Sequence, residues 1–275
     1  MSYRLLVVDI DGTLVGKDGT ISPKNRKAIA EVQSLGILVS LCTGRSIMTS
    51  LPMIKELSLD VPHIFYNGAL VANPLNGLEI LSKPLGPKAI AAAASFARAN
   101  ALSLELYTTK EYFVETWTPT AALHADFLKM WPIVGDFSKT AKGKTIIKAG
   151  FLAVSGEDKR QAREFAGEFS GRLRFEWAQS PTYPDVDFVN IVHPSISKGK
   201  STKILARYLS VPMSQVAAIG DGANDAPLLA VVGLGIAMGN AAPATLAVAK
   251  CVTGPVEEDG LAEAIDTCLL HPLKR

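Results

Sequence analysis

The stretch LLVVDIDGTL, residues 5–14, decides the fold that this sequence predicts. Its first four residues form a continuous apolar run, which is typical of a strand buried on both faces of a parallel sheet. The run ends at Asp9. A buried carboxylate without a partner costs several kcal/mol, so a cation or hydrogen bonds must satisfy Asp9. We therefore interpret Asp9 as a functional residue. The alternative is a plain turn, because Asp11-Gly12 is a common turn dipeptide.

The residues after this strand continue an alternation of helix and strand. Ser22-Pro23 is a helix-start signal, and the apolar residues that follow it recur at helical spacing up to Gly36. Apolar runs over residues 37–41 and 63–66 predict two further strands. A strand, a helix and a strand in this order predict a right-handed parallel crossover.

The last third of the chain repeats this pattern. Apolar runs over residues 216–219 and 234–237 predict strands. Helices are predicted over residues 202–209 and from about Ala226, and two more helical stretches follow them. We expect these elements to complete the sheet that the first third begins.

The middle of the chain, residues 83–192, has a different pattern. It contains longer alternating strands, such as 104–114 and 151–154, and helices over 88–99 and 157–169. The predicted order is helix, two strands, helix, strand, helix, two strands. This order is typical of a separate α+β domain.

The predicted fold class is α/β, with a Rossmann-like parallel-sheet core and an inserted α+β cap domain. The core comprises residues 1–82 and 193–275, and the cap comprises residues 83–192. In open α/β sheets, ligands bind outside the carboxyl ends of the strands. We expect the functional residues there, and we expect the cap to be a lid that excludes water and sets substrate specificity.

Composition and charge limit the classes of function. The chain has 275 residues, 48% of them apolar and 20% charged, without a low-complexity tract, so a globular protein is expected. The formal charge of +2 is spread along the chain without a basic block, which argues against nucleic acid or a membrane as partner. No apolar run reaches the length of a membrane span. A small molecule is therefore the expected partner, and the oligomeric state is left open.

The three cysteines, Cys42, Cys251 and Cys268, have no paired spacing and lie in or beside apolar runs. We therefore expect buried thiols rather than a disulfide or a zinc site. Free thiols suit a reducing compartment, and the apolar stretch at the N-terminus carries two aspartates, which does not fit a signal peptide. These observations predict a cytoplasmic protein.

A second acidic turn, GDGAND over residues 220–225, follows the predicted strand 216–219. Alone, this turn is also typical of a helix N-terminus whose acidic residues complement the helix dipole. The two acidic turns, however, bring two groups of carboxylates to the same edge of the sheet. Such groups need a hard divalent cation, and an all-oxygen site with few protein ligands favours Mg²⁺.

Two further polar residues lie at predicted element ends. Thr43 follows the strand 37–41, and Lys198 precedes the helix 202–209. Alone, a threonine is equally typical of a strand end, and a lysine is usually solvated. Phosphoryl transfer needs a metal, a hydroxyl or backbone donors, and a lysine around the phosphoryl oxygens. Together with the acidic turns, Thr43 and Lys198 supply that set.

With these residues assembled, the chain resembles the haloacid dehalogenase (HAD) superfamily of phosphatases over nearly its whole length. The motifs that carry the resemblance are DIDGTL (residues 9–14), Thr43 in CTGR (residues 42–45), Lys198, and GDGAND (residues 220–225), in the order of the family. The first and fourth motifs together are highly specific. The insertion between the second and third motifs is similar to the Cof-like sugar-phosphatase branch, which has a large α/β (type IIB) cap.

The resemblance implies Mg²⁺-dependent hydrolysis of small-molecule phosphate monoesters, such as sugar phosphates, in two steps. Asp9 would attack phosphorus and form an aspartyl-phosphate, which water then hydrolyses. Asp11 would protonate the leaving alcohol and later deprotonate the water. Because Asp11 follows Asp9 by two residues in a nonhelical turn, both carboxylates can face one substrate while Asp11 stays free to exchange protons. The implied catalytic residues are Asp9, Asp11, Thr43 and Lys198.

The resemblance also implies two sets of ligands. The metal-binding residues would be Asp9 and Asp221 through their carboxylates, Asp11 through its backbone carbonyl, and Asp225 in an outer layer or through water. The phosphate-binding residues would be Ile10, Thr43, Gly44, Lys198 and Asn224. Arg45 and Asn67 would either reach the substrate or brace the loops.

Two other functions would use similar residues. A phosphomutase of the same fold would return the phosphoryl group to a sugar instead of passing it to water. A non-catalytic phospho-aspartate signalling module also has an acidic set, but its acceptor is expected on a later strand and it does not need an acid such as Asp11.

The sequence leaves the substrate open among sugar phosphates, phosphoglycolate, pyridoxal phosphate and nucleotides. Cap aromatics such as Trp177 are more typical of a core than of ring stacking.

Overall fold

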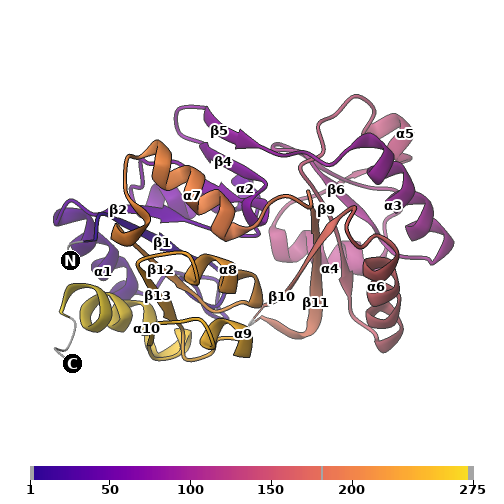
Figure 1. The fold of residues 1–275 in the computed structure, drawn as a ribbon. Coiled ribbons are helices and arrows are strands. Elements are labelled where there is room, and N and C mark those ends of the chain that lie inside the picture. Colours follow the sequence, from indigo (N-terminus) through magenta and orange to yellow (C-terminus); the bar gives the residue numbers. More distant parts are fainter. Residues whose placement is uncertain (1–2, 181, 272–275) are drawn as a thin grey trace.

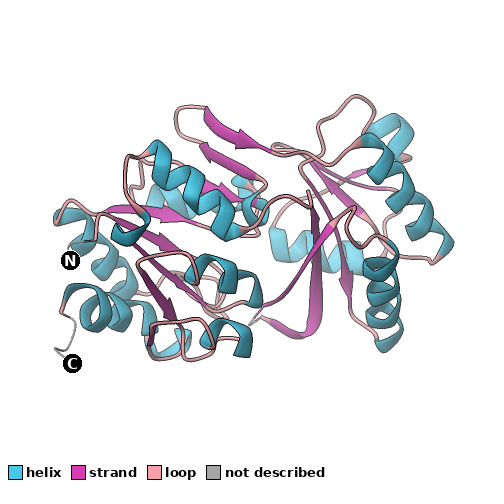
Figure 2. Cartoon of the chain, viewed as in Figure 1, coloured by secondary structure: helices cyan, strands magenta, loops and turns pink. Residues whose placement is uncertain are grey.

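The structure, a computed structural model, describes residues 3–180 and 182–271. The terminal residues of the predicted core (1–2 and 272–275) and residue 181 of the predicted cap lie outside the described part. Two bodies are visible, a core that contains both chain ends and a second body formed by the middle of the chain (Figure 1). Figure 2 shows that helices and strands alternate in the core, whereas the second body is built around one broad sheet.

The core sheet has five strands, all parallel to their neighbours. In spatial order they are β14 (Cys251–Val252), β13 (Leu234–Ala237), β12 (Val216–Gly220), β1 (Leu5–Val8) and β2 (Leu38–Leu41). The two halves of the chain meet where β1 pairs with β12. This arrangement confirms the predicted parallel crossover and the prediction that the last third completes the sheet.

Helices cover both faces of this sheet. The core helices are α1 (Pro23–Ser34), α2 (Ile47–Glu56), α7 (Lys198–Tyr208), α8 (Ala226–Leu229), α9 (Pro243–Leu246) and α10 (Gly260–Glu263). Shorter 3₁₀ or π segments are η1 (Tyr66–Gly68), η2 (Met213–Gln215), η3 (Ala223–Asp225), η4 (Val256–Glu258) and η5 (Ala264–Leu270). The predicted helix 202–209 begins earlier, at Lys198, because the Ser197 hydroxyl caps it by accepting the Lys200 N–H.

The apolar run of β1 is continuous because both of its faces are buried. Leu6 and Val8 belong to the cluster that contains α1 and α10, whereas Leu5 and Val7 belong to the cluster that contains α7 and α8. All four side chains are fully buried. Successive side chains of a strand point to opposite faces, so a two-sided core requires apolar residues at every position.

A second, antiparallel sheet connects the core to the rest of the chain. Its strands are β3 (His63–Phe65), β4 (Leu70–Asn73) and β5 (Leu78–Ser82). Of these, only β3 was predicted from the sequence. It adjoins the main sheet through a single parallel bridge between Cys42 and Ile64. The chain passes from β5 into the cap.

The cap is built on a six-stranded sheet that is antiparallel except for its last pair. In spatial order the strands are β10 (Arg174–Ser180), β11 (Tyr183–Val192), β9 (Lys148–Ala153), β6 (Glu105–Tyr107), β7 (Tyr112–Val114) and β8 (Ile133–Val134). Its helices are α3 (Pro87–Ala99), α4 (Pro119–Leu128), α5 (Phe137–Thr140) and α6 (Gly156–Glu168). These elements form an α+β unit between β5 and α7, so the predicted fold class is confirmed.

The two faces of the cap sheet have different roles. One face packs against α3 and α6, through side chains such as Ala94, Phe151 and Phe165. Figure 1 shows these two helices on the side away from the core. The other face carries α4 and turns toward the core, with Phe188 and Leu152 in a small cluster of their own. The core-facing side of the cap is therefore only partly covered by its own elements.

One predicted strand was wrong. Residues 104–114 form a hairpin, β6 and β7, instead of one long strand. The Thr108 hydroxyl accepts the N–H groups of Lys110 and Glu111, and the Thr108 N–H donates to the Glu111 carbonyl at 2.9 Å. This local hydrogen bonding closes the turn without glycine or proline, so the usual turn signal was missing from the sequence.

The prediction that all three cysteines are thiols was also wrong. Cys251 of β14 and Cys268 of η5 form a disulfide, whereas Cys42 is a buried thiol. The last helical segment lies beside the edge strand, which brings two α-carbons 17 positions apart in sequence to 6.7 Å. The disulfide removes the cysteine argument for a reducing compartment. In the described residues, no helix has the length and apolar character needed to cross a membrane.

Candidate active site

Three carboxylates meet at the carboxyl ends of the central core strands. Asp9 follows β1, Asp221 follows β12, and Asp225 ends the short segment η3. One oxygen from each lies within 4.8 Å of the others. The β1–β12 pairing aligns Val8 with Ile219, so the two strands deliver their acidic residues at the same level. The structure therefore brings together the three carboxylates of the predicted metal site, to which Asp11 was expected to add only its backbone carbonyl.

Lys198 lies inside this carboxylate cluster. Its ammonium donates to Asp9 Oδ1 and to Asp225 Oδ1, both at 2.6 Å. The lysine is 2% exposed, although a solvated lysine was the alternative for this position. Its placement follows from α7, whose first residue is Lys198 and whose cap is Ser197. Burial opposes protonation, but Asp225 and Asp9 outweigh it and raise the pKa of Lys198.

The cluster holds more negative charge than Lys198 can balance. Burial and the neighbouring Asp225 raise the pKa of Asp9 well above its usual range. The same two causes raise the pKa of Asp221 to about 7. Buried carboxylates that repel one another gain from a divalent cation, and three oxygen donors are the chemistry that Mg²⁺ prefers. The residues present therefore fit a divalent metal.

Asp221 is oriented by two side chains that the sequence did not single out. The Thr13 hydroxyl donates to its Oδ1 at 3.0 Å, and the Asn240 amide donates to its Oδ2 at 3.2 Å. Asn240 also donates to the carbonyl of Gly12 at 2.9 Å, which joins the two acidic turns. Thr13 lies within the first motif, but Asn240 follows β13 in a segment with no motif to mark it.

Gly12 allows the two acidic turns to approach one another. Its φ is +82°, and a Cβ atom at this position would lie 2.2 Å from Asp221 Oδ2. Only glycine combines this backbone conformation with so short an approach. The glycine of the first motif therefore has a packing role as well as a turn role.

Asp225 is fixed by the backbone of its own turn. Its Oδ2 accepts the N–H groups of Asp221 and Gly222, at 3.2 and 3.0 Å, while its Oδ1 accepts from Lys198. Both oxygens are thus engaged in holding the turn and the lysine. This is consistent with the expectation that Asp225 supports a metal from an outer layer or through water.

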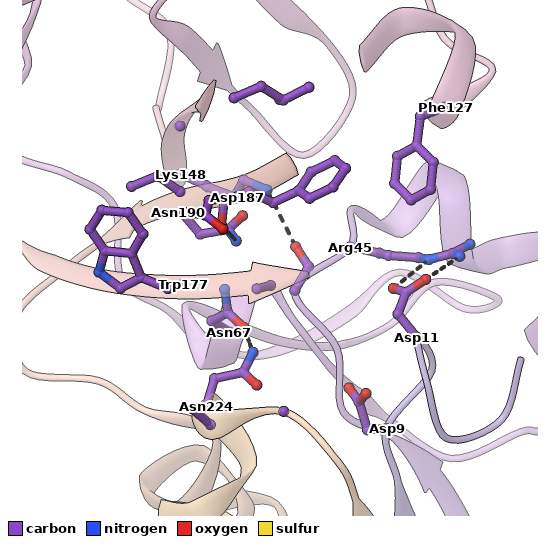
Figure 3. A pocket seen from close by; sticks show the side chains of 18 of the residues that line it. Asp9, Asp11, Arg45, Asn67, Phe127, Lys148, Trp177, Asp187, Asn190 and Asn224 are labelled. Carbon is purple, nitrogen blue, oxygen red and sulfur yellow. Dashed lines mark hydrogen bonds and ion pairs between the residues drawn. The ribbon is translucent and has the colours of Figure 1, made fainter. Parts of the chain in front are cut away.

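Asp11 lies apart from the carboxylate cluster, on the side of the cap. Its two carboxylate oxygens accept a double hydrogen bond from Arg45, from Nε at 2.9 Å and from Nη2 at 2.6 Å (Figure 3). The Asp11 side chain is 28% exposed, in contrast to the buried Asp9. Arg45 therefore orients Asp11 while leaving it open to the cavity.

The loop after β2 places Thr43 and Gly44 beside the carboxylate cluster. Thr43 is fully buried, and its hydroxyl accepts the Arg45 N–H at 3.0 Å. The Thr43 carbonyl accepts the Asn67 N–H at 3.0 Å, which ties this loop to η1. Gly44 lies against the Asn67 side chain, where a Cβ atom would come within 3.1 Å. The predicted residues Thr43 and Gly44 are thus held next to Asn67.

Asn67 carries a polar group that the protein does not satisfy. Its backbone has a φ of +56°, and its Oδ1 accepts from the Asn224 amide at 2.9 Å. Its Nδ2 is buried and has no hydrogen-bond partner in the described part of the chain. Figure 3 shows Asn67 and Asn224 side by side at the floor of the cavity. A buried unpaired donor of this kind points to a bound acceptor.

A cavity of about 360 Å³ lies between these residues and the cap. Its core side includes Asp9, Asp11, Arg45, Lys198 and Asp221, and its cap side includes Glu105, His124, Phe127, Lys148, Trp177 and Asn190. A space of this size suits a small metabolite. Six of the predicted site residues line this cavity, namely Asp9, Asp11, Gly44, Lys198, Asp221 and Asn224, whereas Ile10, Thr43 and Asp225 are not part of its lining. Trp177 lies in the cavity wall and also packs against the apolar core of the cap.

Comparison with known proteins gives the family. Residues 6–265 match the haloacid dehalogenase-like hydrolase family. The 5-amino-6-(5-phospho-D-ribitylamino)uracil phosphatase YwtE of Bacillus subtilis is 28% identical over 292 residues, which cover 97% of this chain and 98% of the relative.

Solved structures agree with this match. A haloacid dehalogenase-like hydrolase from Bacteroides thetaiotaomicron has a TM-score of 0.82 and 28% identity, over 96% of this chain and 99% of that chain. The HAD subclass IIB sugar phosphatase BT4131 has a TM-score of 0.81 at 22% identity, over 95% and 97%, which is a likeness of fold.

The chain belongs to the haloacid dehalogenase-like hydrolase family. Its Rossmann-like core and inserted α+β cap are the fold of the Cof-like branch, and the relatives that it matches include phosphatases. The resemblance drawn from its four motifs is confirmed. The match to a hydrolase family over nearly the whole chain favours an enzyme over the non-catalytic signalling module.

The charge of the cluster predicts how magnesium and pH act on stability. In chelator, the free energy of unfolding should fall as pH rises from the ordinary pKa of 3.8 to the folded value of about 7 for Asp221. Below this window the carboxyl is neutral in both states, and above it the folded state holds the full repulsion. A bound cation offsets that repulsion, so millimolar Mg²⁺ should raise the melting temperature more at about pH 8 than at about pH 5.

Thermal unfolding with and without Mg²⁺ at the two pH values measures this difference. In Asp221→Asn, the neutral amide should abolish most of the gain from Mg²⁺. An equal gain at both pH values, or an undiminished gain in the variant, would contradict a metal site at this cluster.

Proposed function

We propose that the chain hydrolyses small-molecule phosphate monoesters with Mg²⁺, through an aspartyl-phosphate on Asp9. The observation that carries this proposal is the cluster of Asp9, Asp221 and Asp225 around Lys198, under a cavity closed by the cap. A nucleophilic carboxylate, a metal site and a cation within one hydrogen-bonded group are the parts that phosphoryl transfer needs.

We assign the metal to Asp9 and Asp221 through their carboxylates and to Asp11 through its backbone carbonyl. Asp225 holds the turn of Asp221 and the ammonium of Lys198 in place. When bound, Mg²⁺ neutralises charge on the phosphoryl group and on Asp9. The raised pKa values of Asp9 and Asp221 support a cation at this position, because they reflect carboxylates that lack positive charge.

In the first step, an oxygen of Asp9 forms a bond to phosphorus, and the bond from phosphorus to the alcohol oxygen breaks. The departing oxygen keeps the electron pair and takes a proton from Asp11. In the second step, Asp11 takes a proton from water as the water oxygen attacks phosphorus. Inorganic phosphate leaves, and the Asp9 carboxylate is restored. The position of Asp11 on the cavity side, with its side chain 28% exposed, supports this role.

We assign the phosphate oxygens to the backbone of Ile10 and Gly44 and to the side chains of Thr43, Lys198 and Asn224. To this predicted set we add Asn67, whose buried Nδ2 has no partner in the described residues. A phosphate oxygen would satisfy that donor. Arg45 acts through Asp11 in this scheme, so the two residues that the sequence left open receive different roles.

The substrate that we propose is a phosphorylated metabolite with a hydroxylated alcohol part. A relative that acts on a phosphorylated ribitylamino compound and the fold of a sugar phosphatase support this class. We also propose the predicted boundaries, with residues 83–192 as the specificity cap, and a cytoplasmic location, where phosphorylated metabolites are found.

The phosphomutase alternative makes a different product from the same intermediate. Incubation of the protein and Mg²⁺ with a panel of sugar and polyol monophosphates should release inorganic phosphate in proportion to substrate lost. Phosphate assay together with chromatography of the sugar phosphates separates the two reactions. Formation of an isomeric sugar phosphate without release of phosphate would refute the hydrolase.

Asp9→Asn removes the nucleophile while keeping the size of the side chain. We expect phosphate release from the best substrate to fall by about 1000-fold or more, because no aspartyl-phosphate can form. Asp126→Asn is a matched control, since Asp126 forms an exposed ion pair with Lys129 on the surface of the cap, and the activity of this variant should equal that of the wild type. Steady-state rates of both variants, with circular dichroism for folding, decide the matter. A wild-type rate of phosphate release in Asp9→Asn would refute the proposed mechanism.

Asp11→Asn separates the two steps. The p-nitrophenolate ion leaves without a proton, so this variant should still transfer the phosphoryl group from p-nitrophenyl phosphate to Asp9. Water is then not activated, and the intermediate accumulates. Stopped-flow absorbance should show a burst of about one p-nitrophenolate per protein followed by very slow turnover. Normal steady turnover would show that Asp11 is not the base for the second step.

A further inference from the structure

The core-facing side of the cap sheet carries a row of buried polar residues. Glu105 of β6 and Asn190 of β11 are both cross-strand partners of Gly150 in β9. Glu105 is 1% exposed and Asn190 is 7% exposed, and both line the cavity. Because strand positions in register lie on one face, the two polar side chains flank a position that has no side chain.

Gly150 keeps this position open. A Cβ atom there would lie 2.8 Å from the carbonyl oxygen of Val189, so the backbone of the neighbouring strand excludes any larger residue. Lys148 is two positions earlier on the same strand and therefore points to the same face. Figure 3 shows Lys148 and Asn190 on one side of the cavity, across from Arg45 and Phe127.

Lys148 is a buried cation without an ion-pair partner. Its side chain lines the cavity, and the residue is 8% exposed. Its ammonium donates a long hydrogen bond to the Gly44 carbonyl at 3.5 Å and lies 4.7 Å from the centre of the Tyr107 ring. No carboxylate oxygen of the described residues lies within 4.0 Å of it, whereas the other cavity cations, Arg45 and Lys198, both have carboxylate partners.

Burial without a partner is unfavourable for an ammonium group. Burial lowers the pKa of Lys148 to about 8, and Glu105 and Asp11 oppose that effect only in part. An ammonium has three donors, and the Gly44 carbonyl engages only one of them, so a ligand oxygen in the cavity would supply a further acceptor. The position of Lys148 next to Gly44 places that oxygen close to the proposed phosphate site, on the side of the cap.

Glu105 is held in one orientation by its neighbours. Its Oε2 accepts from the Tyr107 hydroxyl and bonds His124 Nδ1 at 2.7 Å. Both of these hydrogen bonds reach the same oxygen, and no side chain of the described residues donates to Oε1, so Oε1 remains as an acceptor. Asn190 donates to the Phe188 carbonyl at 3.3 Å through Nδ2. The row therefore presents a fixed acceptor, an amide and the ammonium of Lys148, which has a carbonyl but no carboxylate of the described residues as a partner.

We propose that Lys148, together with Glu105 and Asn190, binds the hydroxyl groups of the leaving alcohol and that Lys148 is the main specificity-determining residue of the cap. An ammonium only donates hydrogen bonds and a carboxylate only accepts them, whereas a hydroxyl does both. A polyol therefore satisfies all three residues at once.

This inference rests on the proposed phosphatase reaction and adds the part of the substrate that the core does not contact. The test compares kcat/KM for two substrates, the hydroxylated monophosphate that the wild type hydrolyses fastest and p-nitrophenyl phosphate, which has no hydroxyl in its leaving group. In Lys148→Met, the ratio of the two values should fall by about tenfold or more, mainly through a higher KM for the hydroxylated substrate.

A matched control is Lys144→Met in the same cap. Lys144 is a partly exposed lysine paired with Glu111, and its replacement should leave the ratio unchanged. Asn190→Leu provides a second test that keeps the charge of the subsite, and it should lower the same ratio by a smaller factor. Thermal unfolding of each variant shows whether it is folded.

The outcomes separate this inference from the proposed function. No phosphate release by the wild type from any monoester would overturn the proposed function itself. A wild type that prefers p-nitrophenyl phosphate to every hydroxylated substrate, or equal losses on both substrates in folded Lys148→Met, would overturn only the subsite. An unchanged ratio in both Lys148→Met and Asn190→Leu would do the same.

Discussion

Three carboxylates around one buried ammonium are the constraint on which this structure depends. Asp9, Asp221 and Asp225 repel one another at the buried carboxyl ends of the strands, and Lys198 balances only part of their charge. The parallel sheet makes the arrangement possible because its rigid strands deliver residues from both halves of the chain to one edge. The surplus negative charge prepares the site for a divalent cation, and through it for a phosphoryl group.

The other parts of the molecule complete what this cluster cannot supply. Arg45 holds Asp11 close to the cluster but outside it, so one aspartate can exchange protons while Asp9 stays engaged with Lys198. The cap covers the cluster and presents a polar row of its own toward it. The core thus handles a group common to all phosphate monoesters, while the face of the cap sheet is free to differ in what it recognises.

Much of the fold and of the site could be predicted from the sequence. The apolar run of β1 identified a strand buried on both faces, and the acidic turns at two strand ends identified the cluster. The hairpin of residues 104–114 was missed because Thr108 closes its turn through its hydroxyl, without glycine or proline. The disulfide of Cys251 and Cys268 was missed because cysteine spacing says nothing about which distant segments pack together.

The sequence by itself determined the family, the parallel core and the chemistry of the acidic turns, because these depend on local patterns of apolar and charged residues. Only the tertiary structure decided that Lys198 is buried between two carboxylates, that Asn240 orients Asp221, and that Lys148 faces the cavity without an ion pair. Each of these features depends on side chains from segments far apart in the chain. Such contacts arise from packing, and no spacing within one segment encodes them.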